Sequence, residues 1–430
     1  MANLPVIKNI ADLSTTPLRR DVLKILEAGY QSVLTDIVIR EELSIDGDTI
    51  CVRNTNVCLS DFERVFFVGI GKCAVDASVA IERILGERIT DGIVLDVKEG
   101  VFRRVRSIVG THPFPSEQNV VATREIVRML SGLTERDLVI TVISGGGSSL
   151  LCLPHEMSFD TLSNIVRALW QRGATIQEIN TVRKHTSDIQ GGQLAKAAYP
   201  ATVISFLFSD VPGDDIGIIA SGPTVRDEST IKDAERILAK YDTLTMCRLP
   251  GCQLVETPKE ERYFAKVSNI LLVTNRRALE AMRITAEILG YHARVRDTAM
   301  TGVAREKGRE LATIGLPPYT CLLYGGETTV RVSGNGEGGR NQELALAALE
   351  WIADERVVVA AASDGWDNTD IAGAVADTAA RDLAQKRGIS LEEHLALNNS
   401  YQFWKAVGSG IRTGQTGINV ADFTIVLRGP

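Results

Sequence analysis

Short apolar runs alternate with amphipathic stretches along the first half of the chain. The apolar runs are short enough to be buried strands, and the amphipathic stretches have the 3.6-residue period of helices. The predicted strands are 64–69, 92–97, 105–109, 138–143 and 201–208, and the predicted helices are 16–42, 72–85, 116–130, 158–172 and 175–187. Strands and helices that alternate in this way predict a parallel sheet with helices on both faces.

The composition changes between about residues 245 and 266, where Pro250, Gly251 and Pro258 lie beside the charged run Lys-Glu-Glu-Arg. A segment of this kind is typical of a domain boundary. We therefore predict an N-terminal domain over 1–255 and a C-terminal domain over 256–430.

The predicted C-terminal domain begins with a strand, a helix and a second strand at 269–273, 277–289 and 292–295, and its later strands are 321–324, 328–332, 357–361 and 423–427. The short spacing between 324 and 328 predicts some antiparallel pairing, so this sheet should be mixed. The predicted fold class is α/β, with two three-layer α/β/α domains: a Rossmann-like parallel sheet first and a mixed sheet second.

Composition and charge exclude several classes of partner. The 430 residues carry a net charge of −7, without a run of Lys and Arg, and only 5% are aromatic, which argues against nucleic acid. The longest uncharged stretch, 138–155, contains three consecutive glycines and Pro154, so it predicts a strand and a loop rather than a membrane span. Seven cysteines without Cys-x-x-Cys spacing favour free thiols and a cytoplasmic protein, which we expect to be a monomer or homodimer.

Small, hydroxylic or acidic residues follow six of the predicted strands. Open α/β sheets bind ligands beyond the carboxyl ends of their strands. The residues in question are 70–74, 144–149, 209–215, 274–275, 325–327 and 363–365. One such strand end is ordinary turn chemistry, whereas six together predict a ligand cleft.

The first of these strand ends, Gly69 to Ala74, reads Gly-x-Gly-x-x-Ala between a strand and a helix. With Asp96 at the end of the next strand it fits a nicotinamide site, and a tight turn that requires glycine fits equally well. Lys72 is the unusual residue, because a cation at a helix N-terminus opposes the helix dipole unless an anion binds nearby.

A triple glycine gives the next strand end a more specific pattern. Its backbone N–H groups and hydroxyls are suited to cradling an anion, and the residues are Ser144, Gly145, Gly146, Gly147, Ser148 and Ser149. On the following predicted helix, Asn180, Arg183 and Lys184 share one face, which suits either anion binding or plain solvation. We interpret His185 as a packed histidine, and His112 as a hydrogen-bonded loop histidine rather than a catalytic one.

Carboxylates at the strand ends are candidate metal ligands. Asp210 and Asp214 lie close together on one loop, where a cation would relieve their repulsion, while Asp215 reads as a capping residue. Glu327 and Asp364 end strands of the second domain and are further candidates. A glycine-rich segment then leads to Arg340 and Asn341 at a helix start, which suits a clamp for phosphate or carboxylate.

Together these segments resemble the glycerate 2-kinase family, whose C-terminal part is called the MOFRL domain and which is also labelled hydroxypyruvate reductase. The matching stretches are GIGKCA (69–74), GTHPFP (110–115), SGGGSSLL (144–151), INTVRKHTSDIQGGQLA (179–195), SDVPGDD (209–215), IASGPT (219–224), ETPK (256–259), GGETTV (325–330), GGRNQELAL (338–346), SDG (363–365), TDIAGA (369–374) and TGINVAD (416–422). The segment from Asp364 to Thr369 departs from the family, because it has Asp367-Asn368 in place of Asp-Gly-Pro and is one residue shorter.

The resemblance implies a two-domain enzyme of carbohydrate metabolism with its site in the interdomain cleft. ATP would phosphorylate the 2-hydroxyl of D-glycerate, giving 2-phosphoglycerate and ADP, with Mg²⁺ as the metal. By motif, Lys72 and Arg340 match the family's key cations, and Gly71 lies in the motif of Lys72. Asp210 is a candidate both for the metal and for the hydroxyl proton. The first rival is an NAD(P)H-dependent hydroxypyruvate reductase, and the second is a sugar-acid binding module without turnover.

Overall fold

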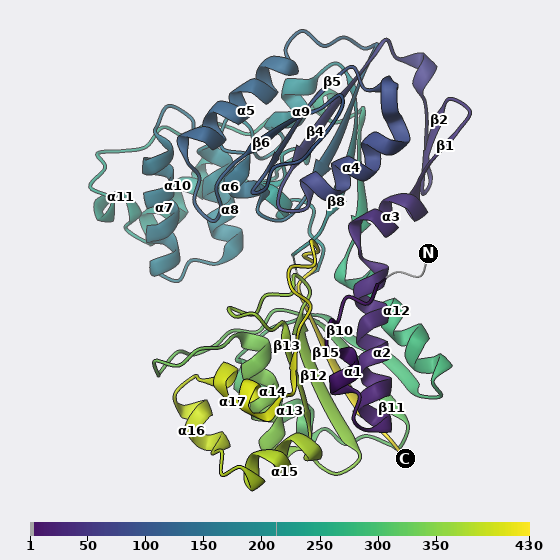
Figure 1. The fold of residues 1–430 in the computed structure, drawn as a ribbon. Helices are drawn as coiled ribbons and strands as arrows, with labels where there is room; N and C mark the ends of the chain where they lie inside the picture. The colour runs from purple at the N-terminus through teal and green to yellow at the C-terminus, as the bar shows by residue number, and fades with distance from the viewer. Residues whose placement is uncertain (1–3, 212) are drawn as a thin grey trace. The chain divides into compact units, whose positions relative to one another are not determined.

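The computed structural model describes residues 4–211 and 213–430, which form two compact units. The parallel-sheet unit contains residues 38–209 and 214–272, and the mixed-sheet unit contains 273–430 with the described parts of 1–37 and 210–213. Each unit is built on its own sheet (Figure 1). This grouping differs from the predicted division at 255/256, both in the position of the boundary and in where the N-terminal segment belongs.

The N-terminal segment belongs to the mixed-sheet unit because its second helix, α2 (Pro17–Ser32), has an apolar face that packs there. Helix α2 lies beside α12 (Asn275–Ile288), as Figure 1 shows. Tyr30 donates a hydrogen bond to the carbonyl of Ala362, and Arg19 forms a buried ion pair with Asp377 at 2.6 Å. These contacts join residues more than 330 positions apart, so local sequence pattern could not reveal them.

The parallel-sheet unit confirms the predicted Rossmann-like arrangement. Its main sheet has the order β6-β5-β4-β7-β8-β9, and β4 to β8 pair in parallel. The strands are β4 (Arg64–Ile70), β5 (Asp91–Asp96), β6 (Arg106–Val109), β7 (Asp137–Ile143), β8 (Thr202–Phe208) and β9 (Val267–Val273). Strand order reverses between β4 and β7, which therefore form the topological switch point where such sheets bind ligands.

Helices cover both faces of this sheet because its strands are apolar on both sides. Helix α4 (Ala74–Leu85) packs on one face, and the core of the other face includes apolar side chains of α5 (Glu117–Met129) and α9 (Gln193–Ala198). A second apolar cluster joins helices that project beyond the sheet. The remaining elements of the unit are α3 (Thr35–Glu42), the antiparallel strands β1 (Leu43–Asp46), β2 (Thr49–Val52) and β3 (Thr55–Cys58), and helices α6 (Gly147–Leu150), α7 (Phe159–Gln171), α8 (Ile176–His185), α10 (Ile231–Lys240) and α11 (Thr243–Met246).

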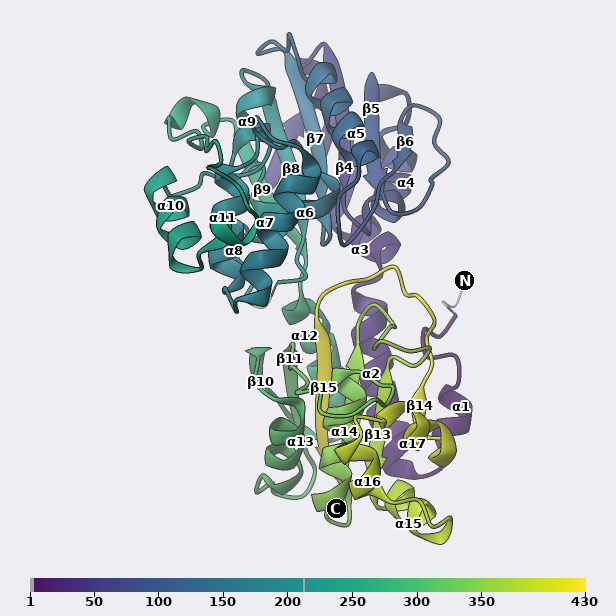
Figure 2. The same cartoon turned by 90° about the vertical axis from the view of Figure 1, so that its left-hand side faces the viewer.

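The mixed-sheet unit also confirms its predicted class. Its sheet has the order β10-β11-β15-β12-β13-β14, and β15 runs antiparallel to both of its neighbours. The strands are β10 (His292–Met300), β11 (Thr320–Gly326), β12 (Arg356–Ala362), β13 (Gly373–Asp377), β14 (Gly410–Ile411) and β15 (Asp422–Arg428). Figure 2 shows β15, the last strand of the chain, in the middle of this unit.

Helices again lie on both faces of the mixed sheet. Helices α2 and α12 cover one face, where the ring of Tyr30 packs edge to face on the ring of Phe423. On the other face, the apolar side chains of α14 form a large part of the core. The helices not yet given are α1 (Ile10–Leu13), α13 (Ala304–Thr313), α14 (Arg340–Trp351), α15 (Thr378–Lys386), α16 (Leu391–Ala396) and α17 (Ser400–Val407). Among the described residues, no helix is long and apolar enough to cross a bilayer.

Two details of the predicted elements are wrong. Residues 328–332 form no strand and make only an isolated bridge between Thr329 and Val303, so the antiparallel pairing comes from β15 instead. The predicted helix over 16–42 is interrupted between α2 and α3. In both places the local apolar pattern was right, and tertiary packing decided the backbone.

Candidate active site

The switch point brings the two glycine-rich turns of the parallel-sheet unit together. Strands β4 and β7 end in register, with Ile70 opposite Ile143. Gly71 follows β4 with a φ of +115°, which disfavours other residues, and a Cβ there would collide with Ser144. The N–H of Lys72 donates to the carbonyl of Gly145 at 2.9 Å. The segments predicted from sequence as separate anion sites therefore form one structure.

The N-terminus of α4 is occupied by a carboxylate of the protein itself. Asp96 is fully buried and accepts hydrogen bonds from the N–H of Val75, at 2.8 Å, and from that of Val97. Burial raises the pKa of Asp96, and these two backbone donors partly offset that effect. In the nicotinamide hypothesis Asp96 would hold a ribose and the helix start a pyrophosphate, but both groups are already used in capping α4.

The segment from Ser144 to Ser149, here called the anion loop, keeps backbone donors available. The N–H groups of Gly145 and Gly146 meet no hydrogen-bond acceptor within the described residues. Ser148 is held from the side, since its Oγ is 2.9 Å from Oγ of Ser221, which in turn donates to Asn180. Ser144 and Ser149 are buried and bonded within the protein, so their role is to shape the loop.

Two cationic side chains of the same unit differ in how they are paired. Arg183 on α8 makes no side-chain hydrogen bond or ion pair with any described residue, and burial lowers the pKa of its guanidinium to about 10. Lys184 instead donates to the buried carboxylate of Asp227 at 3.0 Å. Arg183 therefore remains available for an external anion, whereas Lys184 anchors α8. His185 is fully buried, which confirms its interpretation as a packed residue.

In the mixed-sheet unit, a group of acidic residues surrounds Arg340. Because β15 is antiparallel to β11 and β12, its first residue, Asp422, lies opposite Gly326 and Ala362 at the edge where those two strands end. Asp422 thus joins Glu327 and Asp364, which follow β11 and β12. Sequence reasoning missed Asp422 because it examined only the carboxyl ends of strands.

Arg340, the first residue of α14, is held by two of these carboxylates. Its Nε and Nη2 donate to the two oxygens of Asp422 at 2.5 and 3.0 Å, and Nη2 also donates to Glu327 at 3.0 Å. Burial alone would lower the pKa of Arg340, but the two carboxylates outweigh it and raise that pKa. The Nη1 group has no acceptor among the described residues, so one edge of the guanidinium stays open.

The N-terminus of α14 is closed by another carboxylate that sequence reasoning did not assign. Asp367 is buried and accepts hydrogen bonds from the N–H groups of Asn341 and Gln342, at 3.3 and 2.8 Å. The amide of Asn341 also donates to Asp367 and is buried. The helix start and Asn341 are therefore used within the protein, and the side chain of Arg340 is the candidate that remains for an external anion.

The predicted metal ligands are only partly gathered. Within residues 4–211 and 213–430, no three His, Cys, Asp or Glu side chains lie close enough to hold a metal ion. In the mixed-sheet unit, Glu327 is partly buried, and burial, offset by Arg340 and reinforced by Asp422, Asp210 and Asp364, raises its pKa to about 7. Asp210 accepts a hydrogen bond from Asn419 at 3.3 Å. Asp214 belongs to the other unit, and Asp215 accepts from the N–H of Gly217, as expected for a capping residue.

The comparisons with known proteins agree across nearly the whole chain. Residues 21–249 match a domain of unknown function (DUF4147), and residues 320–422 match the MOFRL family. A D-glycerate 2-kinase of Thermotoga maritima is 34% identical over 95% of this chain and 98% of its own length. A glycerate 2-kinase of Pyrococcus horikoshii is 38% identical over 85% of this chain and 87% of its own.

The chain belongs to the glycerate 2-kinase family. A crystal structure of the Thermotoga maritima glycerate kinase superposes on it with a TM-score of 0.84 and 33% identity, over 95% of this chain and 99% of that one. The family assignment and both sheet classes predicted from sequence are thereby confirmed.

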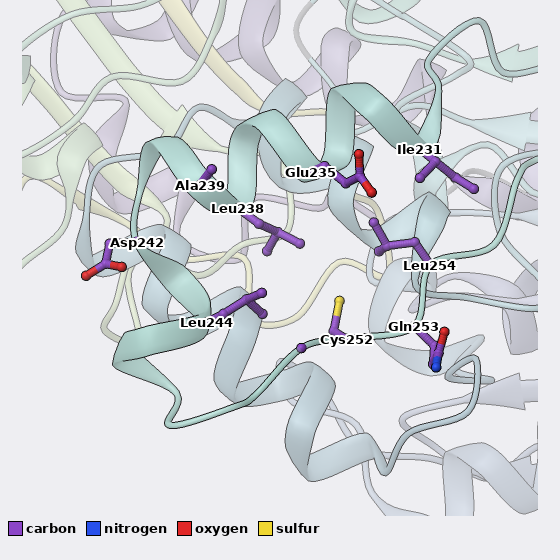
Figure 3. Close-up of a pocket in the computed structure, with 10 residues that line it drawn as sticks. Ile231, Glu235, Leu238, Ala239, Asp242, Leu244, Cys252, Gln253 and Leu254 are labelled. Atoms are coloured by element: carbon purple, nitrogen blue, oxygen red, sulfur yellow. The ribbon is translucent and has the colours of Figure 1, made fainter.

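The structure of this glycerate 2-kinase family member also contains a cavity of about 540 Å³ between α10, α11 and residues 251–254 (Figure 3). Its lining is largely aliphatic and contains Glu235 and Asp242 but no Lys, Arg or His: Ile231, Leu238, Ala239, Leu244, Gly251, Cys252, Gln253 and Leu254 complete it. A cavity with two carboxylates and no cation would repel an anionic substrate. The anion loop in the parallel-sheet unit and Arg340 in the mixed-sheet unit are therefore the two candidate binding regions.

Proposed function

We propose that this chain is a glycerate 2-kinase that transfers the γ-phosphoryl group of ATP to the 2-hydroxyl of D-glycerate, giving 2-phosphoglycerate and ADP. The observation that carries the proposal is a surplus of unpaired donors at the anion loop. The N–H groups of Gly145 and Gly146, together with Arg183, have no acceptor within the described residues. Both substrates and both products are anions, and phosphoryl transfer requires mainly positioning and neutralisation of charge.

Lys72 and Arg340 are the cations that we assign to the transferring group. Lys72 projects from the turn that supports the anion loop, and its Cγ would lie 3.0 Å from a Cβ placed on Gly146. Arg340 is oriented by Asp422 and presents its free Nη1 edge. A planar guanidinium held on one edge by a carboxylate offers the other edge at a fixed angle, which suits an oxyanion that forms only in the transition state.

The carboxylates of the mixed-sheet unit fit a magnesium ion. The pKa of Glu327 is raised to about 7 by burial and by the neighbouring Asp422, Asp210 and Asp364, and a cation would relieve that repulsion. Mg²⁺ commonly keeps its waters and uses one or two carboxylates together with substrate phosphates. One or two of Asp210, Glu327 and Asp364 would hold it, and Asp214 of the parallel-sheet unit is a further candidate. Bound there, Mg²⁺ would neutralise charge on the ATP phosphates.

The proton of the 2-hydroxyl needs an acceptor, and Asp210 is our candidate because its carboxylate is partly accessible at the end of β8.

The proposal also places the enzyme in the cytoplasm, which the free state of all seven cysteines supports. A monomer or a homodimer would be compatible with it, and sedimentation of the purified protein would distinguish the two.

The reductase hypothesis makes a different use of the same turn. It needs Asp96 and the start of α4 to bind a dinucleotide, but Asp96 already accepts a hydrogen bond from the N–H of Val75 at the start of α4. The test is an assay of the purified chain with D-glycerate, ATP and Mg²⁺, in which phosphorus NMR identifies the position of the new phosphate. We expect 2-phosphoglycerate. Oxidation of NADH with hydroxypyruvate, without any ATP-dependent product, would overturn the kinase proposal.

A further inference from the structure

We propose that His112 is a substrate-binding residue that donates a hydrogen bond from a neutral imidazole to an oxyanion bound between Lys72, Arg183 and the anion loop. This inference rests on the proposed function for the identity of the oxyanion, which is a carboxylate or phosphate oxygen of one of the two substrates. It assigns a role to a histidine that the sequence pattern describes only as part of a loop.

The position of His112 is the first support. A Cβ built on Gly146 would lie 3.2 Å from Cδ2 of His112 and 3.0 Å from Cγ of Lys72. Gly146 has a φ of +82°, so glycine is favoured there on conformational grounds as well. The imidazole and the Lys72 side chain therefore lie close together on the same side of Gly146, the glycine whose N–H is free.

The second support is that the ring has no partner inside the protein. His112 is exposed, and neither ring nitrogen makes a hydrogen bond with any described residue. The expected hydrogen-bonded loop histidine is therefore not what the structure shows. A ring that lies beside a cation and free N–H groups can instead use its own N–H for a ligand.

The loop that carries His112 is fixed on both sides of this residue. The buried Asn119 accepts a hydrogen bond from the N–H of Thr111 and donates to the carbonyls of Thr111 and Ser149. On the other side, Ser149 of the anion loop donates to the carbonyl of Pro113 at 2.6 Å. His112 is thus positioned by the same residues that shape the anion loop, so binding a ligand should cost this loop little conformational entropy.

The electrostatic surroundings keep the imidazole neutral. Although the residue is exposed, partial burial of the ring, followed by the charges of Lys72 and Arg183, lowers the pKa of His112 to about 4. A neutral ring adds a hydrogen-bond donor without adding a third positive charge to the site. An anion bound beside it would compensate for the two cations, and the pKa of His112 should then rise.

The first experiment follows His112 by NMR in the wild-type protein. The chain has five histidines, so the His112 signal can be assigned from its loss in His112→Gln. We expect its pKa to rise by about 1 unit or more when D-glycerate or inorganic phosphate saturates the site. His155, which pairs with Asp188 elsewhere in the same unit, serves as the control and should not respond. No change at His112 with either anion would overturn the proposal.

The second experiment separates the two sources of the oxyanion by kinetics. His112→Ala should raise KM about 10- to 100-fold for one substrate, either D-glycerate or ATP, because a hydrogen bond to a charged group is lost. His112→Gln should recover part of the loss, and His155→Ala should behave as wild type. Unchanged KM values for both substrates would refute the role. An NMR response in a protein without kinase activity would support anion binding by His112 and refute the proposed function alone.

Discussion

Replacing Arg340 with lysine tests the central geometry of the site, because the change keeps the charge and removes the planar fork. Arg340 makes two hydrogen bonds to Asp422 and one to Glu327. A lysine ammonium reaches one of these carboxylates and cannot bridge both oxygens of Asp422 while presenting a second edge. Lysine also has no equivalent of the unpaired Nη1 group of Arg340, which we propose donates to the transferring phosphoryl group.

The expected effect on activity is larger than the effect on stability. Loss of one donor to a developing oxyanion costs about 10²- to 10³-fold in kcat, so we expect a fall of that size with KM little changed. For stability, the relevant bonds are those to Asp422, whose side chain is only 7% exposed. Weakening them should cost about 2–3 kcal/mol, or roughly 4–12 °C in Tm for a unit of about 200 residues.

The assay is steady-state kinetics for both substrates beside a thermal melt of the same preparation. Arg331→Lys is the matched control, because Arg331 lies in the same unit with a side chain 79% exposed and pairs only weakly with Glu306. Asp422→Asn should reproduce the fall in kcat, since it releases the guanidinium from its fixed angle.

Three outcomes would refute the reasoning. Wild-type kinetics for Arg340→Lys would remove Arg340 from the site. A raised KM for D-glycerate with normal kcat would make it a ground-state carboxylate clamp. Activity lost only in proportion to unfolded protein would make the residue structural.

Three further predictions concern single carboxylates. Asp210→Asn should raise the Mg²⁺ concentration needed for half-maximal rate at least several-fold. Asp215→Asn alters only a capping hydrogen bond and should leave that concentration unchanged. Equal effects of the two variants in a magnesium titration would refute the assignment. Asp96→Ala should lower the free energy of unfolding by about 1–3 kcal/mol because α4 loses its cap, whereas a ribose-binding Asp96 would show no change in a melt. Burial, followed by the charge of Asp422, raises the pKa of Asp367 to about 7. The protonated carboxyl group therefore stabilises the fold fully below about pH 4, and this contribution is lost as the pH rises through 7. In EDTA, Asp367→Asn should flatten the pH dependence of Tm across this range, whereas Asp370→Asn, at an exposed position, should not.

The parallel-sheet unit could be predicted from sequence because its information is local. Each strand from β4 to β8 is an apolar run followed by a turn, and parallel pairing places all of their carboxyl ends at one edge. The anion loop and Lys72 therefore follow directly from reading strand ends. The sequence could not predict that Ser144 and Lys184 form hydrogen bonds within the protein. Such bonds depend on partners that lie far away in the sequence, such as Asp227 for Lys184.

The mixed-sheet unit was less predictable because its key pairings are long-range. Asp422 is the first residue of the last strand, and it reaches the edge beside Glu327 only because β15 inserts antiparallel between β11 and β12. No local periodicity reports that order. The strand predicted at 328–332 failed for the same reason, since an apolar run becomes a strand only where a neighbouring strand is free to pair with it.

The position of β15 in the centre of the mixed sheet has a consequence for synthesis on the ribosome. Residues 38–272 contain the whole parallel-sheet unit and emerge early, so that unit can fold while translation continues. Helix α2 emerges before it, yet its partners α12, β12 and β15 come last. At about 5–20 residues per second, the roughly 400 residues between α2 and the end of β15 take on the order of 20–80 s to make. During that interval the apolar face of α2, including Tyr30, first lacks α12 and then still lacks β12 and β15, so this helix is a segment of the nascent chain that a chaperone would be expected to protect.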